Sequence, residues 1–196
     1  GISQSNYAVA IGSNAGRNTQ GASSVAIGAS AAETTQGPLA VAIGPSAGKT
    51  TQGDNAIAVG REAGLTIQGD SSIAIGYAAG QTTQGEYSTS IGYVAGNNTQ
   101  GDYGVAMGYA AGQTTQGDNA IAVGRNAGKV TQGASGVAIG YAAGQTTQGD
   151  YAIAVGEGSG ATTQGTLAVA LGYYSGVASQ GANSIAIGNR AGQTNQ

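Results

Sequence analysis

A glutamine occupies every sixteenth position along the 196-residue chain, and the spacing never varies. These residues are Gln4, Gln20, Gln36, Gln52, Gln68, Gln84, Gln100, Gln116, Gln132, Gln148, Gln164, Gln180 and Gln196. Such regularity is typical of a solenoid, in which one supersecondary unit stacks on copies of itself. It favours a scaffold or a fibre over a catalytic protein.

Divided after each glutamine, the chain gives twelve coils of sixteen residues without an insertion. The coils are residues 5–20, 21–36, 37–52, 53–68, 69–84, 85–100, 101–116, 117–132, 133–148, 149–164, 165–180 and 181–196. We expect them to form one β-roll domain over residues 1–196. Because the chain begins within a repeat and terminal coils normally need atypical caps, we expect it to be a segment of a longer protein.

Positions four to seven of each coil alternate between small and large residues. Position six is Ala in every coil except at Ser90, and position four is Ala, Ser or Gly. Positions five and seven are aliphatic, and Thr89 alone breaks this rule. The alternation and the β-branched residues predict a five-residue strand that ends at the Gly of position eight. Thr-Thr-Gln at the end of the coil predicts a second strand.

The repeat pattern therefore predicts an all-β fold, namely a parallel β-solenoid with two short strands per coil. A helix is excluded because the glycines would cost about 1 kcal/mol per site. At about 4.8 Å between neighbouring strands, twelve coils would give a rod about 58 Å long.

Both faces of the first strand are restricted in sequence, so both are expected to be buried. In one arrangement Ala120, Ala122 and Ala127 exemplify the filling of a narrow roll, and the aliphatic face meets another copy of the chain. In the other, Val and Ile lie inside a thicker monomeric solenoid and Ala faces solvent. We predict the narrow roll, because a solvent-facing position has no reason to remain Ala in every coil.

In the narrow roll 23 large apolar side chains would face outward. Leaving them in water forfeits roughly 1.5–3 kcal/mol per side chain, which association about a long axis would recover. We therefore expect copies of this chain to associate side by side about that axis, as an oligomer or a longer fibre. The candidate subunit-interface residues are Val9, Ile11, Val25, Ile27, Val41, Ile43, Ile57, Val59, Ile73, Ile75, Ile121, Val123, Ile153 and Val155.

Three further columns are candidate features of the rod. The glutamines from Gln20 to Gln180 are predicted to form a structural ladder, each side-chain amide donating to the next coil. Tyr77, Tyr93, Tyr109, Tyr141 and Tyr173 share one turn column, as a stack of rings or as an aromatic platform for a sugar or a partner surface. Acids recur at position two, for example Asp54 and Asp70, where we expect solvated turns.

The amino-acid composition argues against several classes of function. The chain has no His and no Cys, so the commonest acid–base and thiol chemistries are missing. A net charge of −3 with few charged residues argues against a nucleic-acid partner. No apolar stretch approaches the roughly 20 residues of a membrane helix. We predict neither enzymatic activity nor a cofactor, nor a metal site.

The runs Ser72–Gly76 and Ser184–Gly188 (Ser-Ile-Ala-Ile-Gly) and Ser24–Gly28 (Ser-Val-Ala-Ile-Gly) resemble the head repeat of trimeric autotransporter adhesins of the YadA type. Similar repeats occur in phage and large-virus fibre proteins. The resemblance implies a left-handed parallel β-roll, a trimer with Val and Ile in its core, and attachment to host surfaces or matrix. It also implies an extracellular, cell-surface or virion-surface location. The adhesin repeat has fourteen residues, whereas this one has sixteen.

The leading functional hypothesis is therefore a rigid attachment module. The alternative is an ice-binding solenoid, because regular Thr-rich β-solenoids can order water on a flat face. Neighbouring strand residues point to opposite faces, so we expect only one of the two Thr columns to face outward. That arrangement would make a poor ice-binding array.

Overall fold

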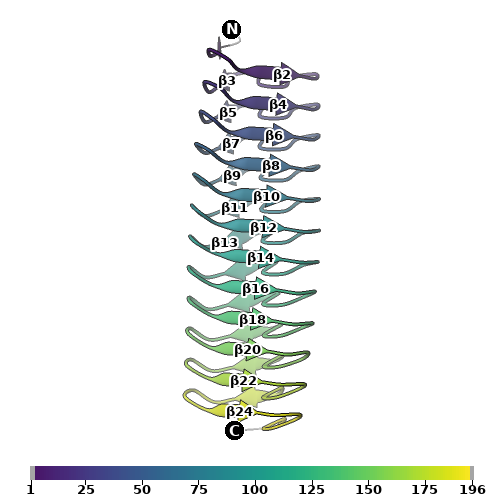
Figure 1. Cartoon of the computed structure of the whole chain (residues 1–196), viewed down its shortest axis with the longest axis vertical. Coiled ribbons are helices and arrows are strands. Elements are labelled where there is room, and N and C mark those ends of the chain that lie inside the picture. Colours follow the sequence, from purple (N-terminus) through teal and green to yellow (C-terminus); the bar gives the residue numbers. More distant parts are fainter. Residues whose placement is uncertain (1–2, 195–196) are drawn as a thin grey trace.

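Each sixteen-residue coil contributes one strand to each of two parallel sheets. In the computed structural model, which describes residues 3–194, the chain is an all-β solenoid with 24 strands and no helix among these residues. The coils stack in sequence order along one long axis (Figure 1). The prediction of a parallel β-solenoid with two strands per coil is confirmed.

One sheet, here the glutamine sheet, consists of the odd-numbered strands. Its strands are β1 (Ser3–Gln4), β3 (Thr19–Gln20), β5 (Thr35–Gln36), β7 (Thr51–Gln52), β9 (Ile67–Gln68), β11 (Thr83–Gln84), β13 (Thr99–Gln100), β15 (Thr115–Gln116), β17 (Thr131–Gln132), β19 (Thr147–Gln148), β21 (Thr163–Gln164) and β23 (Ser179–Gln180).

The other sheet, here the aliphatic sheet, consists of the even-numbered strands. Its strands are β2 (Val9–Ile11), β4 (Val25–Ile27), β6 (Val41–Ile43), β8 (Ile57–Val59), β10 (Ile73–Ile75), β12 (Thr89–Ile91), β14 (Val105–Met107), β16 (Ile121–Val123), β18 (Val137–Ile139), β20 (Ile153–Val155), β22 (Val169–Leu171) and β24 (Ile185–Ile187).

Both sheets pair every residue with the residue sixteen positions further on. Ala58 lies opposite Ala74, and Gln52 lies opposite Gln68. As a result each column of the repeat stacks on itself along the rod, and a property of one position becomes a line on the surface or in the interior.

The strands are shorter than predicted: three residues instead of five in the aliphatic sheet, and two instead of three in the glutamine sheet. The residue at position four uses its N–H inside a turn, as where Gly104 N–H donates to the carbonyl oxygen of Gly101 (3.2 Å). Position fourteen lies in a bend before the second strand begins. The turns therefore take residues that the alternation had assigned to strands.

The turn after each aliphatic strand needs a left-handed residue. In Gly44-Pro45-Ser46-Ala47, the Ala47 N–H donates to the Gly44 carbonyl oxygen (3.2 Å) and Ser46 has φ of 58°. A positive φ at the third residue, with Pro at the second, is the pattern of a type II turn. The equivalent third residues in other coils include Val94 at φ 48°.

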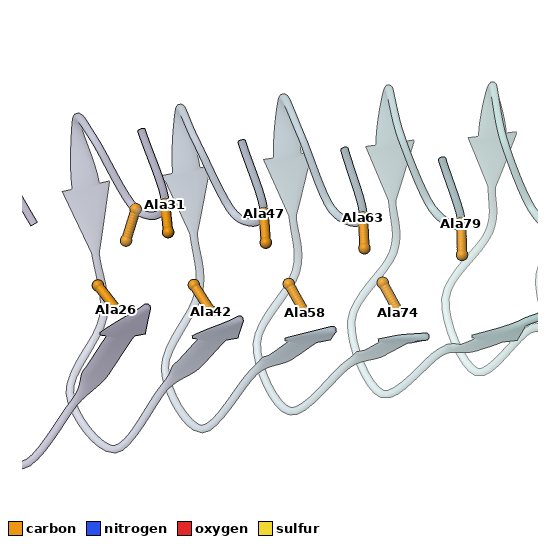
Figure 2. Close-up of a cluster of buried hydrophobic side chains, with 9 residues drawn as sticks. Ala26, Ala31, Ala42, Ala47, Ala58, Ala63, Ala74 and Ala79 are labelled. Carbon is orange, nitrogen blue, oxygen red and sulfur yellow. The ribbon is translucent and has the colours of Figure 1, made fainter. Parts of the chain in front are cut away.

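Alanine fills the interior. Ala26, Ala42, Ala58 and Ala74 of the aliphatic sheet have no exposed surface, and they point toward the position-eleven alanines such as Ala47 across the coil (Figure 2). The two sheets can approach this closely because only small side chains lie between them. The prediction of a narrow roll with Ala inside is confirmed for the single chain.

Candidate interaction surfaces

An aliphatic stripe runs along the outer face of the aliphatic sheet. It consists of positions five and seven of each coil, which flank position six, buried from the second coil onward, and face away from the interior. Ile75, Met107 and Leu171 are 38–42% exposed, and the other members are half-buried or exposed. All fourteen candidate interface residues lie on this stripe, and the 23 apolar members carry no charge.

The sixth coil interrupts the pattern on both sides of one strand. In β12, Ser90 takes the place of the interior Ala, and its hydroxyl donates to Oε1 of Gln100 (2.7 Å). The two alanine clusters of the interior end on either side of this strand, at Ala79 and Ala95. Thr89 takes the place of an aliphatic residue on the outer stripe and is half-buried.

The glutamines bind the two sheets together. Each described glutamine from Gln20 to Gln180 is buried, and its Nε2 donates to the backbone carbonyl oxygen at position five of its own coil. For Gln132 the acceptor is Ile121, at 2.8 Å. This bond crosses the coil instead of following the rod, which the sequence interpretation did not anticipate.

The predicted glutamine ladder forms at some steps only. Nε2 of one glutamine donates to Oε1 of the next at five steps: Gln36 to Gln52, Gln100 to Gln116, Gln116 to Gln132, Gln148 to Gln164 and Gln164 to Gln180. At Gln84 the next acceptor, Gln100 Oε1, is taken by Ser90. The side chain of Gln4 and all of Gln196 lie outside the part of the chain that can be described.

The tyrosines of position nine stack along the rod. Tyr77 and Tyr93 have ring centroids 5.0 Å apart, and Tyr93 and Tyr109 have centroids 5.2 Å apart with planes within 3°. Arg125 lies between Tyr109 and Tyr141, within 5.8 Å of both ring centroids. Both faces of Tyr93 and of Tyr109 are therefore covered, and these rings present edges and hydroxyl groups to a partner.

Tyr173, the last member of this column, contacts Tyr174 edge-on at 4.6 Å. A platform for stacking a sugar needs a free ring face, so Tyr93 and Tyr109 do not offer one in the single chain, nor does Tyr77, which lies between Tyr93 and Arg61 (5.7 Å from the Tyr77 ring centroid). Binding by the remaining rings stays a prediction.

Most of the aspartates at position two accept hydrogen bonds from backbone N–H groups. Oδ1 of Asp70 accepts the N–H of Asp54 in the preceding coil (2.9 Å), and Asp118 accepts the N–H of Asp102 in the same way (3.1 Å). They act as links between coils, in addition to lying at solvated turns. No group of three or more acids that could hold a metal ion occurs within residues 3–194.

The expectation that only one Thr column faces outward is wrong. Thr34 and Thr35 are both exposed, and so are Thr146 and Thr147. The rule of opposite faces holds within a strand, but position fourteen lies in the bend that precedes the two-residue strand. The outer side of the glutamine sheet thus carries two adjacent columns of mostly Thr, here the threonine face.

Neither a pocket nor a helix long and apolar enough to cross a membrane is present in the described part of the chain. The candidate interaction surfaces are therefore rows of side chains that run along the rod, namely the aliphatic stripe, the tyrosine column and the threonine face. A parallel β-solenoid with a continuous apolar line on one side belongs to the structural class of repeat proteins, whose long surfaces serve assembly and binding.

The chain belongs to the YadA head domain family. The family's two-copy head repeat matches residues 36–63, 68–95, 100–127, 148–175 and 164–191, and the resemblance noted in the sequence is thereby confirmed. The first three segments begin 32 residues apart, which is two coils, and residues 64–67 and 96–99 between them are unmatched. Those gaps correspond to the extra two residues per coil. Membership makes this an adhesin-type structural repeat.

Comparison with curated proteins and with solved structures gave no match.

Proposed function

We propose that this chain is a rigid attachment module that associates with copies of itself, as a homotrimer, through the aliphatic stripe. The observation that carries the proposal is the combination of an Ala-filled interior with a line of Val and Ile outside it. The stripe leaves side chains such as Ile75 and Leu171 about two-fifths exposed. Monomeric proteins rarely keep a continuous apolar surface of this kind in water.

A second copy of the chain is the partner that fits the stripe. The stripe repeats once per coil over the length of the rod, so a partner must offer an apolar surface with the same repeat. Another copy has that surface by construction. A rotation axis parallel to the rod brings the stripes together at every coil, which agrees with the trimeric nature of the family.

The mass in solution tests this proposal. Light scattering on the folded chain is expected to give three times the monomer mass of 18.7 kDa. Replacing Ile75 and Met107 by Asn should reduce the mass to that of a monomer, because two polar side chains would interrupt the interface. The matched variant Thr83→Asn and Thr115→Asn, on the threonine face, should remain oligomeric. A monomeric mass for the unmodified, folded chain would exclude the proposal.

The assembled rod is proposed to act outside the cell, on a cell or virion surface, as a stiff and multivalent attachment element without catalytic activity. Family membership supports this. Beads coated with the oligomer are expected to bind host cells or extracellular matrix, whereas beads coated with the Asn-substituted monomer should bind less because multivalency is lost. Equal binding by both would separate attachment from assembly.

A second candidate function, ice binding, is favoured by the exposure of both Thr columns. Thr146, Thr147, Thr162 and Thr163 form a block of four exposed hydroxyl-bearing side chains in register. Within residues 5–194 the two columns are interrupted by Asn18, Ile67, Asn98, Val130, Ala178 and Ser179. Thermal hysteresis measured with the unmodified chain and with Thr147→Lys distinguishes this function: hysteresis that Lys abolishes would support it, and none in the unmodified chain would exclude it.

A further inference from the structure

A uniform aliphatic stripe distinguishes one axial register of an assembly from another only at its two ends. Its members are Val or Ile at nearly every coil, and consecutive coils are related by one inter-strand spacing of about 4.8 Å. A copy that slides by one coil finds the same apolar contacts again and loses only one coil of interface at each end. Away from its ends, the repeated stripe therefore does not distinguish the aligned state from a slipped one, and only a residue that departs from the repeat can.

The sixth coil carries the one polar break in this stripe. Among the 24 outward positions, only Thr89 is not a large apolar residue. We infer that Thr89 is the register key of self-association: it sets copies of this chain side by side with equal coils at equal height. The inference rests on the proposed assembly through the aliphatic stripe and names the residue that aligns it.

The two polar substitutions of β12 differ in whether the chain itself satisfies them. Ser90 faces the interior, and its hydroxyl donates to Gln100 Oε1 at 2.7 Å. The Thr89 hydroxyl faces outward and makes no side-chain hydrogen bond within residues 3–194, while the Thr89 carbonyl oxygen accepts from Gln100 Nε2 (3.0 Å). When the stripe is covered, this hydroxyl needs a partner from outside the chain.

Symmetry supplies that partner only in the aligned state. A rotation axis along the rod places the Thr89 residues of all copies in one layer, where hydroxyl groups can bond to one another or to a shared water. Sliding by one coil places Thr89 in the layer of Ile73 or Val105 of its neighbour. The hydroxyl is then covered by methyl groups without a partner, which disfavours the slipped state. A single buried Asn fixes the register of coiled coils by the same physics.

Disulfide cross-links between engineered cysteines can report the axial register of the copies. The chain has no cysteine of its own, so every cross-link comes from the engineered positions. Two single variants, Val105→Cys and Val137→Cys, lie in one column two coils apart, about 9.6 Å along the rod. A disulfide between Cα atoms more than about 7 Å apart does not form without movement, so a mixed cross-link requires slipped copies. The two variants are mixed, refolded together, oxidised and resolved by mass, so that like and mixed cross-links are counted separately.

With Thr89 present, like cross-links are expected to dominate. Adding Thr89→Val to both chains should raise the mixed fraction roughly tenfold, because the cost of an unpaired hydroxyl in slipped states disappears. Ile73→Val, an apolar exchange in the same column, is the matched control and should change nothing. Combining Thr89→Val with Ile73→Thr moves the polar position by one coil in every copy and should restore the low mixed fraction.

The outcomes separate this inference from the proposed function. A monomeric mass overturns the assembly itself and the register key with it. If the oligomer is intact and the fraction of mixed cross-links is the same for the Thr89 chain and for the Thr89→Val variant, the register key alone is overturned. An oligomer in which Thr89→Val raises the mixed fraction and Ile73→Thr lowers it again supports both.

Discussion

Gln132 reaches across its coil and donates from Nε2 to the backbone carbonyl oxygen of Ile121 at 2.8 Å, joining the glutamine sheet to the aliphatic sheet. The same Nε2 lies 3.0 Å from the carbonyl oxygen of Gly136, and Oε1 accepts from Gln116 at 3.1 Å. A side chain that is 1% exposed thus joins both sheets and three consecutive coils. The narrow interior has room for one such polar side chain per coil because all its other filling is small.

Replacing Gln132 by Met keeps the length of the side chain and removes all three hydrogen bonds. Each bond is worth about 1 kcal/mol, and its loss leaves buried polar groups unpaired, so the free energy of unfolding should fall by roughly 2–3 kcal/mol. Urea unfolding followed by circular dichroism measures this. Thr131→Ser, on the exposed neighbour, is the control and should change stability by less than about 0.5 kcal/mol. Equal effects at both positions would contradict the role assigned to the glutamine.

Ala122 and Val123 are neighbours in β16 that test which face is inside. Ala122 has no exposed surface, so Ala122→Leu should overpack the interior and cost about 3 kcal/mol or prevent folding. Val123→Leu, on the outer stripe, should leave the free energy of unfolding of the single chain nearly unchanged. Denaturant unfolding under conditions that keep the chain monomeric compares them. The opposite ranking would mean that Val lies inside.

Gly76 is required for two separable reasons. A Cβ there would lie 2.4 Å from the carbonyl oxygen of Gly92 in the next coil, and φ is +128°. Gly188 has φ of +118° with nothing within 4 Å of its added Cβ. Gly188→Ala should therefore show the backbone strain alone, about 1–3 kcal/mol, and Gly76→Ala should be clearly worse. The two melting temperatures give the comparison, and equal losses would mean that close approach of the coils does not matter.

Val94 holds a left-handed conformation, φ 48°, that β-branched residues avoid. Asn tolerates this region and occupies the equivalent position at Asn14, φ 58°. Val94→Asn should raise the free energy of unfolding by about 1 kcal/mol, because an L residue pays 1–2 kcal/mol there. The reverse exchange, Asn14→Val, should lower it. A melting temperature that falls for Val94→Asn would show that Val94 makes packing contacts worth more than the strain.

Tyr93 is stacked between Tyr77 and Tyr109. Tyr93→Ser, the residue that the first coil carries at this position as Ser13, should lower the free energy of unfolding by roughly 1–2 kcal/mol through the loss of two ring contacts. Tyr93→Phe keeps the stack and should be nearly neutral. Thermal unfolding distinguishes the variants. If Phe were as harmful as Ser, the hydroxyl group and not the ring would carry the effect.

The period, the strands and the filling of the interior could all be predicted from the residues. Ala stands at position six in eleven coils, and a position that excludes every larger residue has to be enclosed. Once Ala122 and its equivalents are inside, alternation along a strand places Ile121 and Val123 outside, because successive side chains point to opposite faces. The constant sixteen-residue spacing then stacks equivalent positions of consecutive coils on one another.

The directions of side chains in bends and turns required coordinates. Thr34 and Thr35 both reach solvent because Thr34 lies in a bend, which alternation along a strand does not describe, just before the strand begins at Thr35. Gln132 was expected to bond along the rod and bonds mainly across it, since the distance between the sheets is set by the alanines of both. The Asp70 carboxylate meets a backbone N–H of another coil, a contact that depends on how the coils are offset.

By itself, then, the sequence determined the repeat, the parallel pairing and the identity of the enclosed residues, since all three follow from one period and from residue size. The tertiary structure alone decided where the amides, carboxylates, hydroxyls and rings point. These groups act across a few ångströms between segments that the sequence separates, so their partners are set by the packed distance between sheets and coils.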